Sequence, residues 1–242
     1  MYQLYNGDCL EVMKNIPDKS IDMILCDLPY GTTQCKWDSI IPFDNLWEQY
    51  NRIIKNNGAI VLFGSEPFST NLRMSNIKNY KYDWIWRKTK AQGFLNCKKM
   101  PLKDYENICV FYKKQPIYNP QGLKFGSFNN FRKSKINKNE DVYGTERKFS
   151  TSVASNYPKQ IIKFSNKSGK GHLHPTQKPV ELLEYLIKTY TNEGETVLDN
   201  CMGSGSTGVA CVNTNRNFIG IELDEGYFKI AEERLREVIE NE

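Results

Sequence analysis

The sequence has no run of 18 apolar residues, and its first eight residues contain no Lys or Arg ahead of an apolar stretch. A membrane-spanning helix needs about 20 mostly apolar residues, and a secretory leader needs a basic segment followed by an apolar one. We therefore expect a protein that neither crosses a membrane nor is secreted.

Metal-ligating and disulfide patterns are also scarce. Histidine occurs only at His172 and His174, and an H-x-H pair without a neighbouring Cys or carboxylate is a weak zinc signal, so we predict no metal site. The seven cysteines are odd in number and form no C-x-x-C pair. We expect reduced thiols and hence a cytoplasmic protein.

Positive charge is concentrated in one segment. The net charge is +5, yet residues 113–170 hold thirteen Lys or Arg against three acidic residues, together with eight aromatic residues. Cations neutralise phosphates and rings stack on bases, so this composition predicts a nucleic-acid surface. A solvated surface insertion is the alternative.

Strand and helix patterns alternate on both sides of the basic segment. Strands are predicted at 2–5, 21–26, 59–63, 81–87, 107–112, 196–199 and 218–223, and helices at 8–16, 44–55, 66–75, 179–190, 206–212 and 224–239. Asn57-Gly58 is predicted to cap the helix 44–55, and Trp84 and Trp86 to lie in the core. This order predicts a mostly parallel sheet covered by helices on both faces.

A glycine-rich loop follows the strand 196–199. Gly203 to Gly208 fit G-x-G-x-x-G, and Glu222 ends the next strand, a pattern in which backbone N–H groups approach a nucleotide and the acid holds ribose hydroxyls. A dinucleotide and an adenosine-bearing cofactor such as S-adenosylmethionine both fit. Asp199 favours the second, because a carboxylate repels a pyrophosphate and attracts a sulfonium or ammonium group.

A carboxylate and an aromatic ring follow the apolar strand 21–26, in the sequence Asp27-Leu28-Pro29-Tyr30. An ordinary turn is the alternative reading. A doubly wound sheet in the order 3-2-1-4-5, with the glycine-loop strand as strand 1 and 218–223 as strand 2, needs a third strand beyond 218–223. Only one helix follows 218–223, so we expect the strand 2–5 to take this third position. The strand 21–26 then lies beside the glycine-loop strand, where such sheets bind ligands.

These motifs resemble those of the amino-group DNA methyltransferases of the permuted beta class. Asp27 to Tyr30 resemble the family's [DNS]-P-P-[YFW], Asp199 to Thr207 resemble D-P-F-x-G-S-G-T-T, and residues 174–179 read H-P-T-Q-K-P as in the family. Gly7-Asp8 and residues 219–222 complete five blocks in order. The departures from the family pattern are Leu28, Asn200, Cys201 and Ser206.

The resemblance implies a fold and a division of the chain. The fold is a doubly wound, mostly parallel α/β sheet of seven strands in the order 3-2-1-4-5-7-6, circularly permuted. Residues 1–112 would form the catalytic half of the methyltransferase domain, 113–170 a small target-recognition insertion, and 171–242 the half that binds S-adenosylmethionine.

The resemblance also implies residue roles. Asp27 and the Leu28 carbonyl would accept hydrogen bonds from the exocyclic amine of a flipped base, and Tyr30 would stack on the base. Pro29 belongs to the same catalytic motif. The implied cofactor-binding residues are Asp8, Cys9, Lys178, Asp199, Cys201, Gly203, Ser204, Gly205, Thr207, Glu222 and Leu223. The predicted DNA contacts are Lys124, Arg132, Lys133, Lys135, Arg147 and Lys148.

Three of these roles have structural alternatives. Asp8 could cap the helix that follows it, Glu222 could be the acid at a helix N-terminus, and Lys178 could be a surface residue. In the family, Lys178 would hold the carboxylate region of the cofactor.

The resemblance implies a site-specific DNA methyltransferase that produces N6-methyladenine, since Asp at position 27 favours adenine over cytosine in this family. The open alternatives are a methyltransferase that acts on the cytosine amine, on RNA or on a protein amide, a non-catalytic nucleic-acid binder, and a dinucleotide oxidoreductase. The expected partner is double-stranded DNA, and a homodimer and a partner restriction endonuclease are both compatible with the family. We expect a bacterial or phage-encoded protein of the cytoplasm, associated with the nucleoid.

Overall fold

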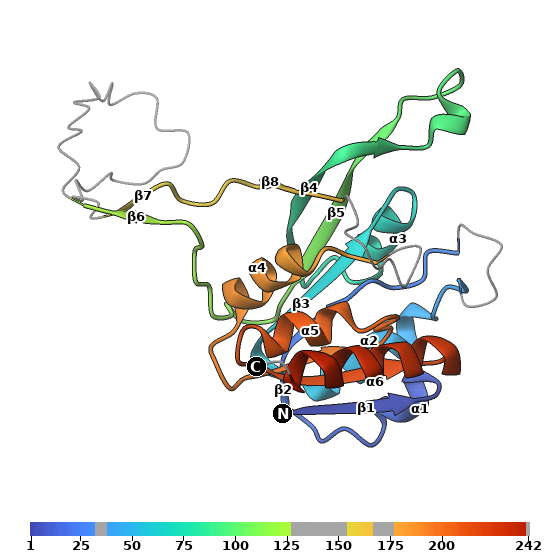
Figure 1. Cartoon of the computed structure of the whole chain (residues 1–242), viewed down its shortest axis with the longest axis vertical. Coiled ribbons are helices and arrows are strands. Elements are labelled where there is room, and N and C mark those ends of the chain that lie inside the picture. The colour runs from blue at the N-terminus through green and yellow to red at the C-terminus, as the bar shows by residue number, and fades with distance from the viewer. Residues whose placement is uncertain (32–37, 127–153, 167–176, 241–242) are drawn as a thin grey trace. The chain divides into compact units, whose positions relative to one another are not determined.

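The protein is described by a computed structural model over residues 1–31, 38–126, 154–166 and 177–240 (Figure 1). Within these residues the main sheet has eight strands in the order β1-β10-β9-β2-β3-β5-β4-β8. Their bounds are β1 Tyr2–Asn6, β2 Ile21–Cys26, β3 Ile54–Gly64, β4 Tyr80–Gln92, β5 Lys103–Phe111, β8 Ile161–Phe164, β9 Thr196–Asp199 and β10 Asn217–Glu222. The five strands from β1 to β3 are parallel, β5 runs antiparallel to both β3 and β4, and β8 runs parallel to β4.

The first seven strands of the sheet follow the predicted order 3-2-1-4-5-7-6, but the sheet has eight strands and not seven. The additional strand, β8, comes from the basic segment and pairs with Ile85 to Lys88 of β4. Ile162 is buried in it while Ile161 is exposed, and the Trp86 Nε1–H donates to the Phe164 carbonyl at 3.1 Å. This alternation and this bond hold β8 at the sheet edge.

Helices cover both faces of the sheet. The first group is α1 Cys9–Met13, α2 Phe43–Ile53 and α3 Phe68–Ser75, and the second is α4 Val180–Tyr190, α5 Ser206–Val212 and α6 Glu225–Glu240. Ile24 and Cys26 of β2 pack in the cluster that contains the first group, and Met23 and Leu25 pack in the cluster that contains the second. Successive side chains of a strand point to opposite faces, so β2 is buried on both.

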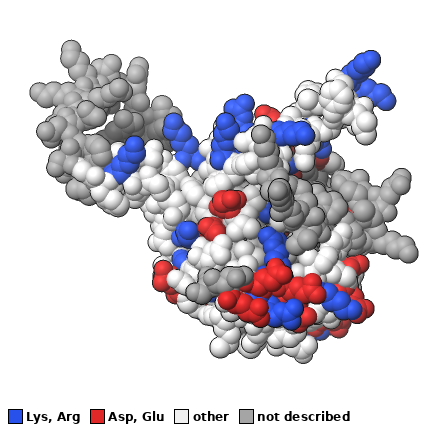
Figure 2. Space-filling model, viewed as in Figure 1, with Lys and Arg blue, Asp and Glu red and all other residues white. Residues whose placement is uncertain are grey.

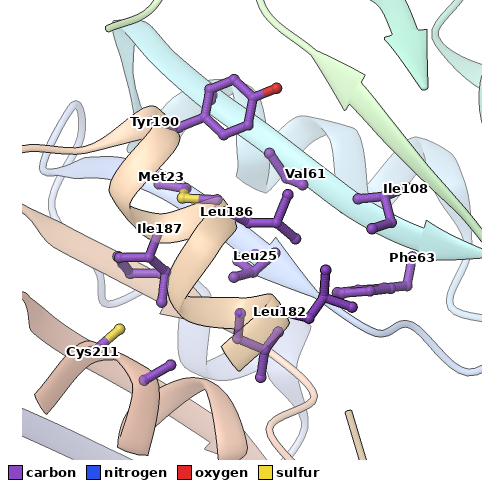
Figure 3. Packing of buried hydrophobic residues seen from close by; sticks show 14 of the residues in the cluster. Met23, Leu25, Val61, Phe63, Ile108, Leu182, Leu186, Ile187, Tyr190 and Cys211 are labelled. Carbon is purple, nitrogen blue, oxygen red and sulfur yellow. The ribbon is translucent and has the colours of Figure 1, made fainter. Parts of the chain in front are cut away.

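The face under α4 shows how the core is packed. Leu182, Leu186 and Ile187 point from α4 toward Met23, Leu25 and Val61 of the sheet (Figure 3). Tyr190 ends the helix, and its hydroxyl accepts a hydrogen bond from the Trp84 Nε1–H at 2.7 Å. Trp84 and Trp86 are both buried, as expected.

The end of α2 differs from the prediction. The helix ends at Ile53 with Ile54 as its C-cap, so the prediction that Asn57-Gly58 caps it is wrong. Both residues lie in β3, where the register moves from Ile21 opposite Ile54 to Met23 opposite Ala59. A Cβ at Gly58 would lie 2.8 Å from the Asp22 carbonyl oxygen, so the glycine serves this close approach of two backbones.

The chain divides into two compact units, Met1–Asn119 with Gln160–Glu242, and Pro120–Lys159. In the smaller unit, β6 Lys124–Phe125 pairs antiparallel with β7 Ala154–Ser155. A short 3₁₀ turn, η1 Phe94–Asn96, lies between β4 and β5 in the larger unit. Among the described residues, none of the helices has the length and apolar character that spanning a membrane requires.

We predict that Leu186→Ala lowers the free energy of unfolding by about 2–5 kcal/mol, because it leaves a cavity between α4 and the sheet. Denaturant unfolding followed by far-UV circular dichroism measures the change. The matched control Ile77→Ala removes a side chain that is 57% exposed and should change that free energy by no more than about 0.5 kcal/mol. Equal effects of the two substitutions would contradict the packing described here.

Candidate active site

The carboxyl ends of the central strands surround one cavity. β2 and β9 are neighbours, with Met23 opposite Val197 and Ile24 opposite Leu198, so the residues that follow them lie together. The cavity has a volume of about 430 Å³, within the range of small-molecule sites. Segments from both ends of the chain therefore form one site.

The structure brings nearly all the predicted catalytic and cofactor-binding residues to this cavity; Gly205 does not line it. The lining includes Asp8, Cys9, Asp27, Leu28, Pro29, Tyr30, Lys178, Asp199, Cys201, Gly203, Ser204, Thr207, Glu222 and Leu223.

Asp27 lies at the centre of a charged cluster. The Tyr30 hydroxyl donates to Asp27 Oδ1 at 2.7 Å, and the Lys178 ammonium contacts Asp27 Oδ2. Lys178 Nζ is also 3.6 Å from Glu106 Oε2, and Lys88 Nζ donates to Glu106 Oε1 at 2.6 Å. The cluster therefore holds two cations and two carboxylates, and the charges balance.

The protonation states in this cluster follow from the pairing. Burial lowers the pKa of Lys178, but the carboxylates of Asp27 and Glu106 outweigh it and raise that pKa above its ordinary value. Burial raises the pKa of Glu106, but Lys178 and Lys88 outweigh it and lower that pKa. Lys178 and Glu106 are therefore both charged at neutral pH.

Tyr30 is fixed from two sides. Its hydroxyl bonds to Asp27, and its ring stacks on Phe68 of α3 with the ring centroids 4.8 Å apart. Burial, and then the negative charge of Asp27, raise the pKa of Tyr30 well above its ordinary value. The phenol therefore keeps its proton and acts as a donor toward Asp27.

Two departures from the family motifs have a structural explanation. The Leu28 side chain is buried in the cluster under α1 to α3, while the residue also lines the cavity. Asn200 is buried, and its Oδ1 accepts a hydrogen bond from the Tyr50 hydroxyl of α2 at 2.5 Å. A polar side chain in place of the family's proline is thus paired and not orphaned.

Two glycines of the glycine loop adopt left-handed backbone conformations. Gly203 and Gly205 have φ values of 52° and 76°, and a Cβ at Gly205 would lie 3.0 Å from the Ala231 Cβ. Gly205 is the N-cap of α5 and packs under α6, which explains why it does not line the cavity. From α6, Arg234 donates to the Ser204 carbonyl at 3.1 Å and secures the loop.

Asp199 joins β9 to this loop. Its Oδ1 accepts from the Cys201 N–H at 3.1 Å and its Oδ2 from the Thr207 hydroxyl at 2.6 Å. Burial raises the pKa of the Asp199 carboxyl to about 6, although these two hydrogen bonds act in the other direction. A cation bound in the cavity would lower this pKa and favour the ionised carboxylate.

Asp8 and Glu222 combine structural bonds with a place at the cavity. Asp8 Oδ1 accepts from the Leu10 N–H at 2.8 Å and caps α1, so the capping alternative holds for this residue, which also lines the cavity. Glu222 accepts from the Gly203 N–H at 2.9 Å, and burial raises its pKa.

Several lining residues were not predicted as site residues. Lys88 and Glu106 lie on β4 and β5, strands that carry several other charged residues, so no local pattern distinguishes these two. Trp86 is buried, as the sequence predicts, and it also lines the cavity. Lys178, at the cavity, is only 10% exposed in its side chain, so the surface alternative is wrong.

Some predicted residues lie outside the described part of the chain. They are His172, His174, Arg132, Lys133, Lys135, Arg147 and Lys148. Lys124 is described and is exposed on β6. Among the described residues, no group of three or more His, Cys, Asp or Glu side chains is placed to hold a metal ion.

Comparison with known proteins identifies relatives along nearly the whole chain. The type II methyltransferase M.HinfI of Haemophilus influenzae is 28% identical over 274 residues, covering 98% of this chain and 69% of the relative. The DNA adenine methyltransferase YhdJ of Escherichia coli is 27% identical, covering 96% and 82%. The crystal structure of an M1.HpyAVI–SAM complex superposes with a TM-score of 0.67 at 28% identity, covering 97% and 99%. The model of the N6_N4_Mtase family, described as DNA methylase, matches residues 21–233, and the chain therefore belongs to this family of DNA methylases.

Proposed function

We propose that this protein transfers a methyl group from S-adenosylmethionine to the exocyclic amine of adenine in DNA. The observation that carries the proposal is the meeting of Asp27-Leu28-Pro29-Tyr30 with the glycine loop in one cavity. The relative YhdJ, which is named a DNA adenine methyltransferase, supports the choice of base, and the SAM complex of M1.HpyAVI supports the cofactor.

The chemistry of the cavity suits this cofactor. When bound, S-adenosylmethionine supplies an electrophilic methyl group on a cationic sulfonium. Asp8, Asp199 and Glu222 add carboxylates to the lining, and Gly203 and Ser204 of the glycine loop line the cavity as well. We assign Glu222 to the ribose hydroxyls, Asp8 to the adenine side, and Asp199 with the loop to the methionine end.

Asp27 and Leu28 would prepare the amine for reaction. An exocyclic amine is a poor nucleophile because its lone pair is delocalised into the base. Hydrogen bonds from its two protons to the Asp27 carboxylate and the Leu28 carbonyl favour a pyramidal nitrogen aimed at the methyl group. Each carboxylate oxygen has two acceptor sites, so Asp27 can accept the amine while it keeps Tyr30 and Lys178.

Lys178 acts on Asp27 in this proposal and not only on the cofactor. Its ammonium holds Asp27 from one side and is itself 5.0 Å from the centroid of the Phe63 ring. This arrangement fixes the carboxylate before the base arrives. Tyr30, backed by Phe68, would stack on the base, which must leave the duplex to reach this depth.

The basic segment 113–170 is proposed to recognise the target sequence. It lies in the sequence between the two halves that form the cavity, and its thirteen cations suit phosphate contacts. We retain residues 1–112 and 171–242 as the catalytic and cofactor-binding halves of a permuted domain. Operation in a bacterial restriction–modification system, with or without self-association, fits the type II relatives.

We predict that the protein, incubated with DNA and methyl-labelled S-adenosylmethionine, produces N6-methyladenine. Enzymatic digestion of the DNA and chromatography of the nucleosides identify the base. Asp27→Asn should lower the rate about 10²–10⁴-fold, because the amide cannot accept at both positions. Asp18→Asn, at a side chain that is 71% exposed, is the matched control. Label on N4 of cytosine, or full activity of Asp27→Asn, would refute the base or the catalytic assignment.

We predict that Leu28→Ala separates stability from catalysis. The substitution keeps the backbone carbonyl but removes a buried side chain, so the free energy of unfolding should fall by about 2–5 kcal/mol. Methyl transfer at a temperature where the variant is folded should stay within about threefold of the natural protein, since the proposed contact is made by the carbonyl. A decrease comparable to that of Asp27→Asn would show that the side chain itself serves the reaction.

We predict that cofactor binding tightens as pH rises from 5 to 7. Asp199 has a pKa of about 6, so protons compete with the cationic cofactor below this pH and the affinity should rise about tenfold over the interval. Isothermal titration calorimetry with S-adenosylmethionine at pH 5, 6 and 7 measures this affinity. Asp199→Asn should bind more weakly at pH 7 and remove most of this dependence; an unchanged dependence would remove Asp199 from the cofactor site.

A further inference from the structure

The hairpin that joins β4 to β5 combines two unusual features. We define the hairpin arm as residues 87–103, the end of β4, the turn η1 and the first residue of β5. It contains six Lys or Arg and no acidic residue. Its tip exposes large apolar side chains, with Phe94 77%, Leu95 98% and Met100 50% accessible. Large exposed apolar groups on a folded domain mark a contact surface.

The arm is continuous with the cavity. Lys88 and Gln92, at its base, line the cavity and are joined by a hydrogen bond of 2.6 Å from Lys88 Nζ to Gln92 Oε1. Asn166 bonds to both the N–H and the carbonyl of Lys90, at 2.9 and 2.8 Å, and fixes the base of the arm to the segment after β8. The base of the arm is therefore part of the cavity lining and is fixed to the segment after β8.

The charge of the arm favours a polyanion. Lys90, Lys98, Lys99 and Lys103 are exposed, and none of them pairs with a carboxylate in the described part of the chain. Figure 2 shows Lys and Arg side chains at the end of the hairpin, whereas Asp and Glu gather over α6. The cations flank the apolar tip and leave it uncovered. A phosphate backbone with stacked bases behind it has the matching chemistry.

We propose that the hairpin arm binds the DNA duplex, its lysines on the phosphates and Phe94 with Leu95 inserted as a wedge beside the target base. Apolar side chains of other proteins enter base steps in this way and offset the cost of unstacking. Removing a base from the duplex costs free energy, and a wedge that fills the gap stabilises the opened form. This inference rests on DNA as the substrate and extends the DNA contacts beyond residues 113–170.

The lysines are tested by the salt dependence of DNA binding, which needs no catalysis. Lys98→Ala with Lys99→Ala should reduce the slope of log affinity against log salt by up to about 1.8, about 0.9 for each phosphate that is no longer neutralised. The control pair Lys14→Ala with Lys229→Ala removes exposed lysines elsewhere and should leave the slope unchanged. An unchanged slope in the arm variant would overturn the phosphate contacts even if no methyl transfer is ever detected.

The wedge is tested by comparing duplex and heat-denatured DNA from the same genomic source. Phe94→Ser with Leu95→Ser should lower the methylation rate of the duplex about tenfold but that of separated strands by less than about twofold, since those strands need no opening. Met74→Ser with Ile77→Ser, at similarly exposed apolar side chains, is the matched control. Equal decreases on both substrates, or a change from a dimer to a monomer in light scattering with normal DNA activity, would overturn the wedge and assign the tip to self-association.

Discussion

The parallel pairing of β2 with β9 is the constraint on which the site depends. It places residues 27–30, from the first part of the chain, beside residues 199–207, from the last part, at one edge of the sheet. Parallel strands present their carboxyl ends on the same side, so the two motifs need no further device to meet. The helices on both faces then serve chiefly to bury strands that have no solvent face.

The charged cluster around Asp27 is the second requirement. Buried charges are costly unless each has a partner, and here Lys178 faces both Asp27 and Glu106 while Lys88 holds Glu106 from the other side. Glu106 and Lys88 come from β5 and β4, in the antiparallel part of the sheet. Through Lys178 they help to hold Asp27, which follows the parallel strand β2. A catalytic carboxylate that is fixed before the substrate arrives loses little free energy on binding it.

Local patterns predicted most of the fold, because the apolar periods and the glycine loop depend on neighbouring residues. The order of the five parallel strands was predicted because only one helix follows the strand 218–223, and the order of the remaining two strands came from the family resemblance. Lys88, Glu106 and the contact of Lys178 with Asp27 could not be predicted, because they arise from tertiary pairing. The eighth strand was not predicted because β8 has only four residues and lies in a basic segment. Asn57-Gly58 was wrongly predicted to cap a helix, because Asn and Gly are also suited to the irregularity that these residues form in β3.

The position of β9 and β10 has a consequence for how this chain acquires its structure during synthesis. Both strands lie between β1 and β2, although they are made after all the other described strands. Until residue 222 has left the ribosome, β1 has no neighbour in the sheet and β2 has one exposed edge. The centre of the sheet is therefore completed at the end, through contacts between distant residues that form slowly. The nascent protein must keep the inner edge of β2 from pairing with other chains throughout this interval.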